Sequence, residues 1–115
     1  MLKPKVLPKI LEQANTNGVR STTLLNKEGA LLATSGEDGK VVAAIFSNIW
    51  ATYALRPNLE YLLCECENGR IVMTQVTKEL YLCLYGNETA QFGMLKHKAK
   101  ALKDYLSEPL KKIDT

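Results

Sequence analysis

The chain has 115 residues, of which 46% are hydrophobic and 23% are charged, and fifteen Lys and Arg against twelve Asp and Glu give a formal net charge of +3. These values are typical of one globular domain, residues 1–115, and exclude an intrinsically disordered chain. No apolar run approaches the roughly 18 residues of a membrane span, and three cysteines are too few for a secreted disulfide scaffold. We therefore expect a cytoplasmic protein without a signal peptide or membrane-spanning segment.

The N-terminal part of the chain predicts a helix followed by a β-hairpin. Apolar residues recur at helical spacing up to about Asn15, and Pro8 falls in the first turn of this helix. Residues 19–25 and 30–35 are two candidate strands, and the first of them is rich in β-branched side chains. Residues 26–29, Asn-Lys-Glu-Gly, are typical of a hairpin turn between them.

The most informative segment is a predicted central helix from Lys40 to Leu55. At about 100° per residue its apolar side chains cover an arc of roughly 200°. The polar residues inside it, Ser47, Asn48 and Thr52, carry no charge. Since a helix that covers one small sheet needs about half of that arc, the surplus apolar surface favours a protein partner. The alternative is a helix buried on all sides within its own subunit.

Three strands and a last helix follow. Residues 56–58, Arg-Pro-Asn, should end the central helix. The predicted strands cover residues 59–66, 70–77 and 80–85. The last helix should run from about Ala90 to Leu106, with Pro109 ending it.

The element order is therefore helix, two strands, helix, three strands, helix, which belongs to the α/β (α+β) class. Short hairpin connections imply a five-stranded antiparallel sheet. We expect the central helix on one face and the two terminal helices on the other. The strand at residues 59–66 is apolar on both faces, so at a sheet edge it would need another chain to pair with it.

The sequence offers no arrangement typical of an enzyme or a metal site. His97, the one histidine, lies among lysines without an orienting carboxylate. Cys64 and Cys66 form a C-x-C pair, too few ligands for a zinc site, and the residues from Gly36 to Lys40 depart from a phosphate-binding loop at two positions. We therefore expect no enzymatic activity, no catalytic residue, no cofactor and no metal.

Positive charge is concentrated at both ends of the chain. Residues 1–10 carry three lysines and no acid, and residues 90–115 carry six lysines and three acids. Such a stripe attracts nucleic acid, anionic lipid or an acidic protein, or it is only a solvated helix face. The aromatic residues among the C-terminal lysines, Phe92 and Tyr105, fall on the predicted buried side, so we expect no nucleic-acid binding.

Several strings of residues are shared with one family and together span nearly the whole chain. They are Gln13-Ala14-Asn15-Thr16, Gly18-Val19, Ser21-Thr22, Leu24-Leu25-Asn26, Glu28-Gly29, Ser47-Asn48-Ile49-Trp50-Ala51 with Tyr53, Gly69-Arg70, Phe92-Gly93-Met94-Leu95-Lys96, Lys98-Ala99, Ala101-Leu102, Tyr105-Leu106 and Glu108-Pro109-Leu110. They resemble the roadblock/LC7-domain subunits of the Ragulator complex, the late endosomal and lysosomal adaptor of MAPK and mTOR signalling.

The resemblance implies a roadblock/LC7 fold that dimerises through the central helix and the third strand, so that two sheets become continuous. The implied partner is a second roadblock-domain subunit, a MEK-binding scaffold, and the pair is a heterodimer. The protein-interface residues that the resemblance implies here are Val42, Phe46, Ile49, Trp50, Tyr53, Leu59, Tyr61, Leu63 and Glu65.

By the same resemblance the chain is a non-enzymatic scaffold or adaptor. A lipid-anchored Ragulator subunit would hold the pair on the cytosolic face of late endosomes and lysosomes, so this chain needs no membrane insertion of its own. The complex would carry the Rag GTPases that recruit mTORC1 and would also support MAPK signalling.

Two other functions stay open at this point. The first is a homodimeric roadblock-type dynein light chain, which uses the same fold and much the same interface. The second is a profilin- or PAS-like small-ligand sensor with a pocket between the sheet and the central helix. Two departures from the family also matter: residues 56–58 replace a longer polar loop and Pro8 shortens the first helix, so partner contacts at these places are not carried over.

Overall fold

The computed structural model describes residues 4–53 and 60–114. After a short 3₁₀ helix, η1 (Pro4–Val6), the helices are α1 (Leu7–Glu12), α2 (Gly39–Tyr53) and α3 (Phe92–Asp114). The strands are β1 (Val19–Asn26), β2 (Leu31–Gly36), β3 (Tyr61–Cys66), β4 (Gly69–Gln75) and β5 (Leu80–Asn87). They pair antiparallel in the order β2-β1-β5-β4-β3. This confirms the predicted element order and the five-stranded antiparallel sheet.

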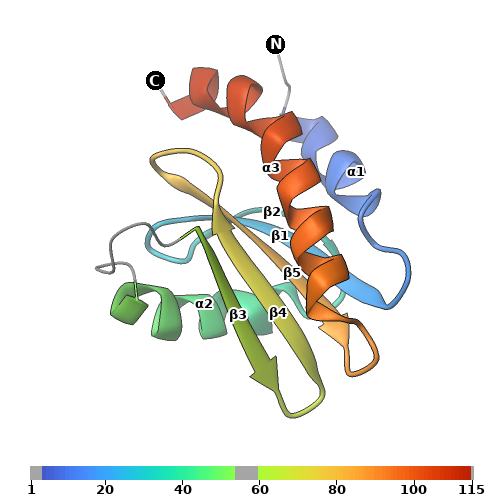
Figure 1. Cartoon of the computed structure of the whole chain (residues 1–115). Coiled ribbons are helices and arrows are strands. Elements are labelled where there is room, and N and C mark those ends of the chain that lie inside the picture. The colour runs from blue at the N-terminus through green and yellow to red at the C-terminus, as the bar shows by residue number, and fades with distance from the viewer. Residues whose placement is uncertain (1–3, 54–59, 115) are drawn as a thin grey trace.

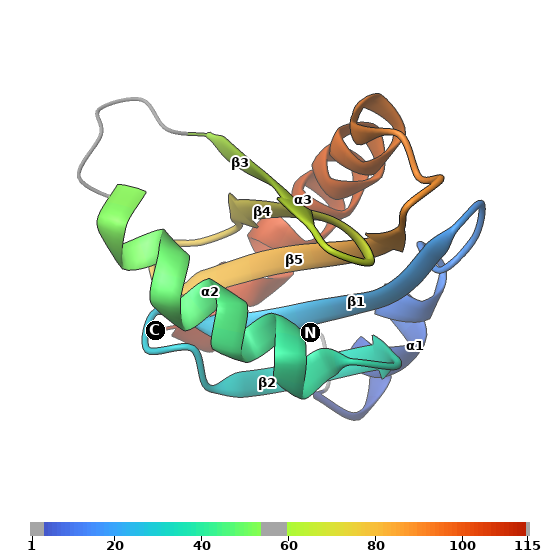
Figure 2. The same cartoon turned by 90° about the horizontal axis from the view of Figure 1, so that it is seen from below.

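The sheet lies between two helical layers (Figures 1 and 2). The helices α1 and α3 cover one face and α2 crosses the other, as predicted. Because α2 packs mainly on β1, β2 and β5, strand β3 lies beside this helix rather than beneath it (Figure 2). The predicted helix end at residues 56–58 and the first predicted strand residue, Leu59, lie outside the described residues.

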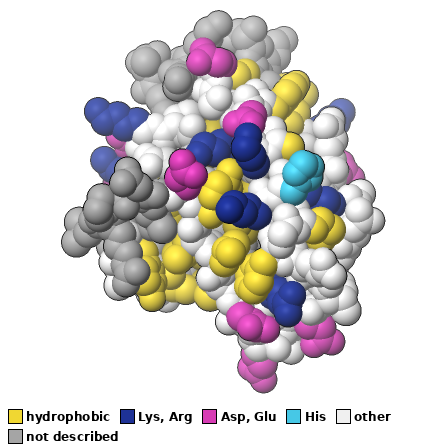
Figure 3. All heavy atoms as spheres, in the orientation of Figure 1, with side chains coloured by type: hydrophobic (Ala, Val, Ile, Leu, Met, Phe, Trp, Pro, Cys, Tyr) yellow, Lys and Arg dark blue, Asp and Glu magenta, His cyan; other side chains and the backbone are white. Residues whose placement is uncertain are grey.

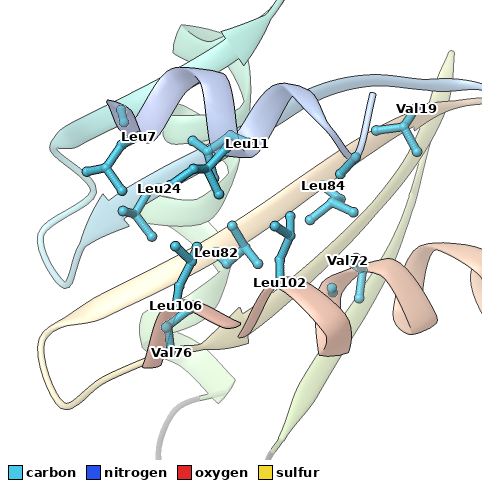
Figure 4. Close-up of a cluster of buried hydrophobic side chains, with 14 of the residues drawn as sticks. Leu7, Leu11, Val19, Leu24, Val72, Val76, Leu82, Leu84, Leu102 and Leu106 are labelled. Atoms are coloured by element: carbon cyan, nitrogen blue, oxygen red, sulfur yellow. The ribbon is translucent and has the colours of Figure 1, made fainter. Parts of the chain in front are cut away.

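Alternating strand side chains build a separate core on each face of the sheet. The core under α1 and α3 includes Leu7, Leu11, Leu24, Leu82, Leu84, Leu102 and Leu106 (Figure 4). Their strand neighbours, such as Leu25 and Cys83, point the other way and form the core under α2. This follows from the two-residue period of a strand.

The β1–β2 turn has the local chemistry that its sequence predicts. The side-chain oxygen of Asn26 accepts hydrogen bonds from the backbone N–H groups of Glu28 at 3.0 Å and Ala30 at 2.9 Å. Gly29 takes a φ of 86°, which glycine adopts without steric cost. The turn therefore closes the hairpin with its own polar groups satisfied.

The first helix is shorter than predicted, because α1 ends at Glu12 rather than near Asn15. The carbonyl oxygens beyond this end are bound by a residue distant in sequence. Lys98 of α3 donates from Nζ to the carbonyl oxygens of Ala14 at 3.1 Å and Thr16 at 2.7 Å. This lysine therefore ties the end of α1 to α3.

Two expectations about the last helix are wrong. Pro109 lies inside α3, which continues to Asp114, and the ribbon changes direction toward its C-terminal end (Figure 1). A proline removes one helical hydrogen bond and bends the helix, but the fully buried Leu110 holds the next turn against the core. Tyr105 is 63% exposed instead of buried, because its neighbour Leu106 occupies the core position.

Candidate protein–protein interface

The inner face of α2 belongs to the core of its own subunit. Val42, Phe46 and Trp50 follow one another at four-residue spacing and are 0%, 1% and 6% exposed. The rings of Phe46 and Trp50 stack with centroids 5.8 Å apart, and Tyr81 of β5 lies 5.2 and 5.1 Å from them. The side chains of Val42, Phe46 and Trp50 therefore attach α2 to its own sheet. Their predicted contact with a partner stays a prediction.

One flank of α2 turns toward β3. Ile45 borders the same buried cluster as Leu62 and Cys64 of β3. The opposite flank faces the β1–β2 turn, where a side chain added at Gly29 would collide with the hydroxyl of Ser47. The β3-facing flank thus lies next to the part of the sheet that α2 does not cover.

This flank is apolar and accessible. Val41, Ile45 and Ile49 recur every four residues and so lie in one row along the helix. Val41 is 55% exposed, and Ile45 and Ile49 are half-buried. No residue of α2 after Lys40 carries a charge. The row therefore has surface that a second protein could bury without desolvating an ion.

The strand β3 is paired on one side only. It pairs with β4 and forms one edge of the sheet, so its outward backbone N–H and C=O groups have no strand partner among residues 4–53 and 60–114. Leu62 and Cys64 lie on the α2 side, while Tyr61 packs on the α3 side and Leu63 follows it by alternation. We call the free edge of β3 together with Val41, Ile45, Ile49 and Leu62 the α2–β3 surface.

The other predicted contact residues keep some exposed surface. Ile49 and Tyr53 are half-buried on α2; on β3, Tyr61 is half-buried, Leu63 is 45% exposed and Glu65 is exposed. Their contact with a partner stays a prediction, and Leu59 lies outside the described residues. The sequence interpretation left two residues of this surface, Val41 and Ile45, out of the predicted contacts. Each is an apolar residue one position before a buried residue of α2, and that position was the available signal.

The thiols near this surface are poorly suited to nucleophilic chemistry. Burial raises the pKa of the Cys66 thiol, and the adjacent Cys64 raises it further. Burial also raises the pKa of Cys83, which is fully enclosed. Since the thiolate is the reactive form of cysteine, these groups are mostly unreactive near neutral pH.

Within residues 4–53 and 60–114 no three His, Cys, Asp or Glu side chains are grouped so as to hold a metal ion. His97 lies exposed on α3. In the same part of the chain no helix has the length and hydropathy needed to cross a bilayer.

A cavity of about 320 Å³ lies between α1 and α3. It is lined by Gln13, Ala14, Lys98, Ala101, Leu102 and Tyr105. Lys98 directs its amine at three oxygens of Ala14 and Thr16, and burial lowers its pKa. The cavity is thus on the opposite side of the sheet from the pocket that a sensor with a site under the central helix would require.

Comparisons with known proteins found a matching family model and a related protein of similar length. The family model described as Roadblock/LC7 domain matches residues 9–86. A Caenorhabditis elegans protein named Ragulator complex protein LAMTOR2 homolog is 38% identical over 119 residues, covering 98% of this chain and 96% of that protein.

Solved structures show the same fold. The Roadblock/LC7 domain from Streptomyces avermitilis superposes with a TM-score of 0.76 at 13% identity, covering 90% of this chain and 96% of that one. The gliding protein MglB from Thermus thermophilus superposes with a TM-score of 0.75 at 19% identity, covering 94% of this chain and 91% of that one.

Proposed function

The chain belongs to the Roadblock/LC7 domain family, and we propose that it is a non-enzymatic adaptor subunit that pairs with a second roadblock protein through the α2–β3 surface. The observation that carries this proposal is the position of an uncharged apolar helix flank beside an unpaired strand edge.

The helix flank supplies the apolar part of the interface. Burial of apolar surface contributes about 25 cal/mol per Å², and Val41, Ile45 and Ile49 all retain surface to bury. The described residues leave this surface uncovered, since α2 packs mainly on β1, β2 and β5 through its opposite, buried row. A second subunit with a similar apolar helix would bury this exposed surface.

The strand edge supplies the hydrogen-bonding part of the interface, which depends on direction. An added strand would take up the free N–H and C=O groups of β3 in regular hydrogen bonds and fix the orientation of the two subunits. Leu63 and Leu62, one on each face of β3, would then be covered along with the edge.

The Caenorhabditis elegans relative, by its name a Ragulator complex protein, supports assembly into a Ragulator-like complex. In this proposal the partner is a MEK-binding roadblock scaffold, and a lipid-anchored Ragulator subunit wraps the pair. The complex lies on the cytosolic face of late endosomes and lysosomes and supports Rag GTPase–mTORC1 and MAPK signalling.

The test is pairing in solution. The chain is co-expressed with each roadblock-domain protein of its own genome, and the mass of the purified species is measured by light scattering. We expect a one-to-one complex with one of them, which Ile49→Asp abolishes because it places a charge in the apolar row.

Ala101→Asp is the matched control, since Ala101 lies on α3, across the sheet from α2. It should leave pairing intact. A stable monomer with every roadblock protein would overturn the proposal. A homodimer that excludes the other subunits would instead favour the light-chain alternative.

A further inference from the structure

A tyrosine on the edge strand is surrounded by lysines of α3. The Nζ atoms of Lys96 and Lys103 lie 5.2 and 5.6 Å from the centroid of the Tyr61 ring. Both ammonium groups are thus within cation–π distance of one ring. Figure 3, which views the face carrying α3 and β3, shows dark blue basic side chains among yellow hydrophobic ones near its centre.

These two lysines form no ion pair at salt-bridge distance in the described part of the chain. Lys100, in the same row of α3, pairs with Asp104 at 2.9 Å, and Glu60 also favours its charged form. Neither Lys96 nor Lys103 forms an ion pair with any residue of the described chain. The ring of Tyr61 thus gathers two ammonium groups that no described residue pairs at salt-bridge distance, while the carboxylates of Glu60 and Asp104 also act on this ring and Asp104 is paired with Lys100.

The lysines border the free edge of β3. Tyr61 and Leu63 lie on the side of the strand that faces α3, and Leu63 is 45% exposed. A strand added to this edge would lie about 4.8 Å away, and every second side chain would project over the same face. One of these side chains would fall beside Tyr61, within reach of the flexible Lys96 and Lys103.

We propose that Lys96 and Lys103 select partners whose edge-pairing strand carries Asp or Glu beside Tyr61. This deepens the proposed function, because it rests on strand addition at β3 and states the chemistry of the partner that is accepted. A carboxylate there gains two cations, whereas a lysine or arginine at the same place is repelled. Charge complementarity of this kind sets specificity and association rate more than total affinity.

The first test uses peptides in place of the partner. The isotope-labelled chain is titrated at low ionic strength with blocked peptides of alternating Thr and Glu, Thr and Gln, or Thr and Lys, and amide shifts are followed by NMR. We expect the Glu peptide to shift amides of both β3 and α3 and to bind at least about tenfold more tightly than the Gln peptide. Added salt should reduce this difference.

The matched variants change the same net charge at different places. Lys96→Glu/Lys103→Glu should lose the preference for the Glu peptide and gain one for the Lys peptide. Lys5→Glu/Lys9→Glu, on η1 and α1 where both lysines are exposed, should leave the preference unchanged.

Three results would overturn the inference. The Gln peptide could bind as well as the Glu peptide, or the shifts could be confined to α3 without β3. The third is co-sedimentation with phosphatidylserine vesicles that depends on Lys96 and Lys103 without any preference among the peptides, which would assign the lysines to a membrane surface. Since the pairing experiment uses whole subunits and a mass readout, a failure of selectivity is distinguishable from a failure of pairing.

Discussion

Phe46 and Trp50 hold α2 on the sheet through their contacts with Tyr81. Val41, one position before the fully buried Val42, is 55% exposed. A step of one residue turns a helical side chain by about 100°. At the residue scale, that rotation alone decides whether an apolar side chain of α2 stabilises the subunit or lies on its surface.

Trp50→Ala should therefore destabilise the subunit itself. We expect its free energy of unfolding to fall by about 3–5 kcal/mol, since a large buried ring is lost. Val41→Ala should change it by less than about 0.5 kcal/mol. Urea denaturation of the isolated chain measures both, and equal losses in the two variants would contradict the assignment of core and surface.

Cys83 should make stability fall in alkaline solution. Burial raises its pKa above the ordinary value of 9.0 in the folded chain only, so the unfolded thiol releases its proton first as the pH rises. The folded state then binds more protons, and the free energy of unfolding decreases above about pH 9, by at most about 1.4 kcal/mol per pH unit. Below that pH the contribution is fully present.

Urea denaturation across this pH range measures the effect. Cys83→Ala should show a shallower decline than the native chain, whereas Cys64→Ala, at a half-buried position, should keep most of it. Parallel declines in the native chain and Cys83→Ala would show that other groups cause the loss.

At the element scale, the β2–α2 junction determines where α2 begins. Gly36 has a φ of 92°, and Asp38 also lies in the left-handed region at 67°. Arg20 of β1 binds Asp38 at 3.1 Å and Glu37 at 3.6 Å. The first turn then closes with the N–H of Val42 on the Asp38 carbonyl oxygen at 2.9 Å. A change here would disturb the first turn of α2.

Gly36→Ala should be poorly tolerated. Its Cβ would collide with the Arg20 carbonyl oxygen, and its φ is unfavourable for alanine. We expect a loss of more than about 2 kcal/mol of stability. Gly93→Ala is the control, because it lies in the first turn of α3 and, apart from its chain neighbours and the backbone of its own helix, no atom lies within 4 Å of the added carbon. It should raise stability slightly, by up to about 0.5 kcal/mol. Thermal and urea unfolding of the two variants should therefore change in opposite directions.

At the scale of the whole molecule, the two faces of the sheet are unequally covered. The helices α1 and α3 occupy one face, while α2 packs mainly on the β2, β1 and β5 portion of the other and shares a buried cluster with Ile71 and Met73 of β4 (Figures 1 and 2). The edge strand β3 is the strand farthest along the sheet from β2. A partner that binds there would add its binding free energy to folding, because it binds the native state and not the unfolded chain.

The partner should accordingly stabilise this chain. At a free partner concentration of 100 times Kd we expect about 2.7 kcal/mol of additional stability, seen as a higher Tm in a thermal scan. Ile49→Asp should lose this increment while Ala101→Asp keeps it. If the Tm did not change when the second subunit was added, binding to the native state at the α2–β3 surface would be contradicted.

Much of the fold could be predicted from the amino-acid sequence alone. Hydrophobic periodicity and the turn residues 26–29 are short-range signals, so they identified the α-helices, the strands and the antiparallel hairpins of the described chain. The same signals predicted a partner surface on the central helix and the strand after it, and this stays a prediction. The shared strings of residues pointed to the family that the comparisons then showed.

Only the tertiary structure decided which apolar side chains are buried within the subunit and which stay exposed on its surface. Periodicity records that Val42, Phe46 and Trp50 are apolar, but not that β5 lies against them. In the same way Pro109 continues a helix because of what packs on Leu110. Lys96 and Lys103 meet Tyr61 only because the sheet brings distant segments together. Contacts between residues far apart in the chain depend on how whole elements pack, and no local pattern contains that information.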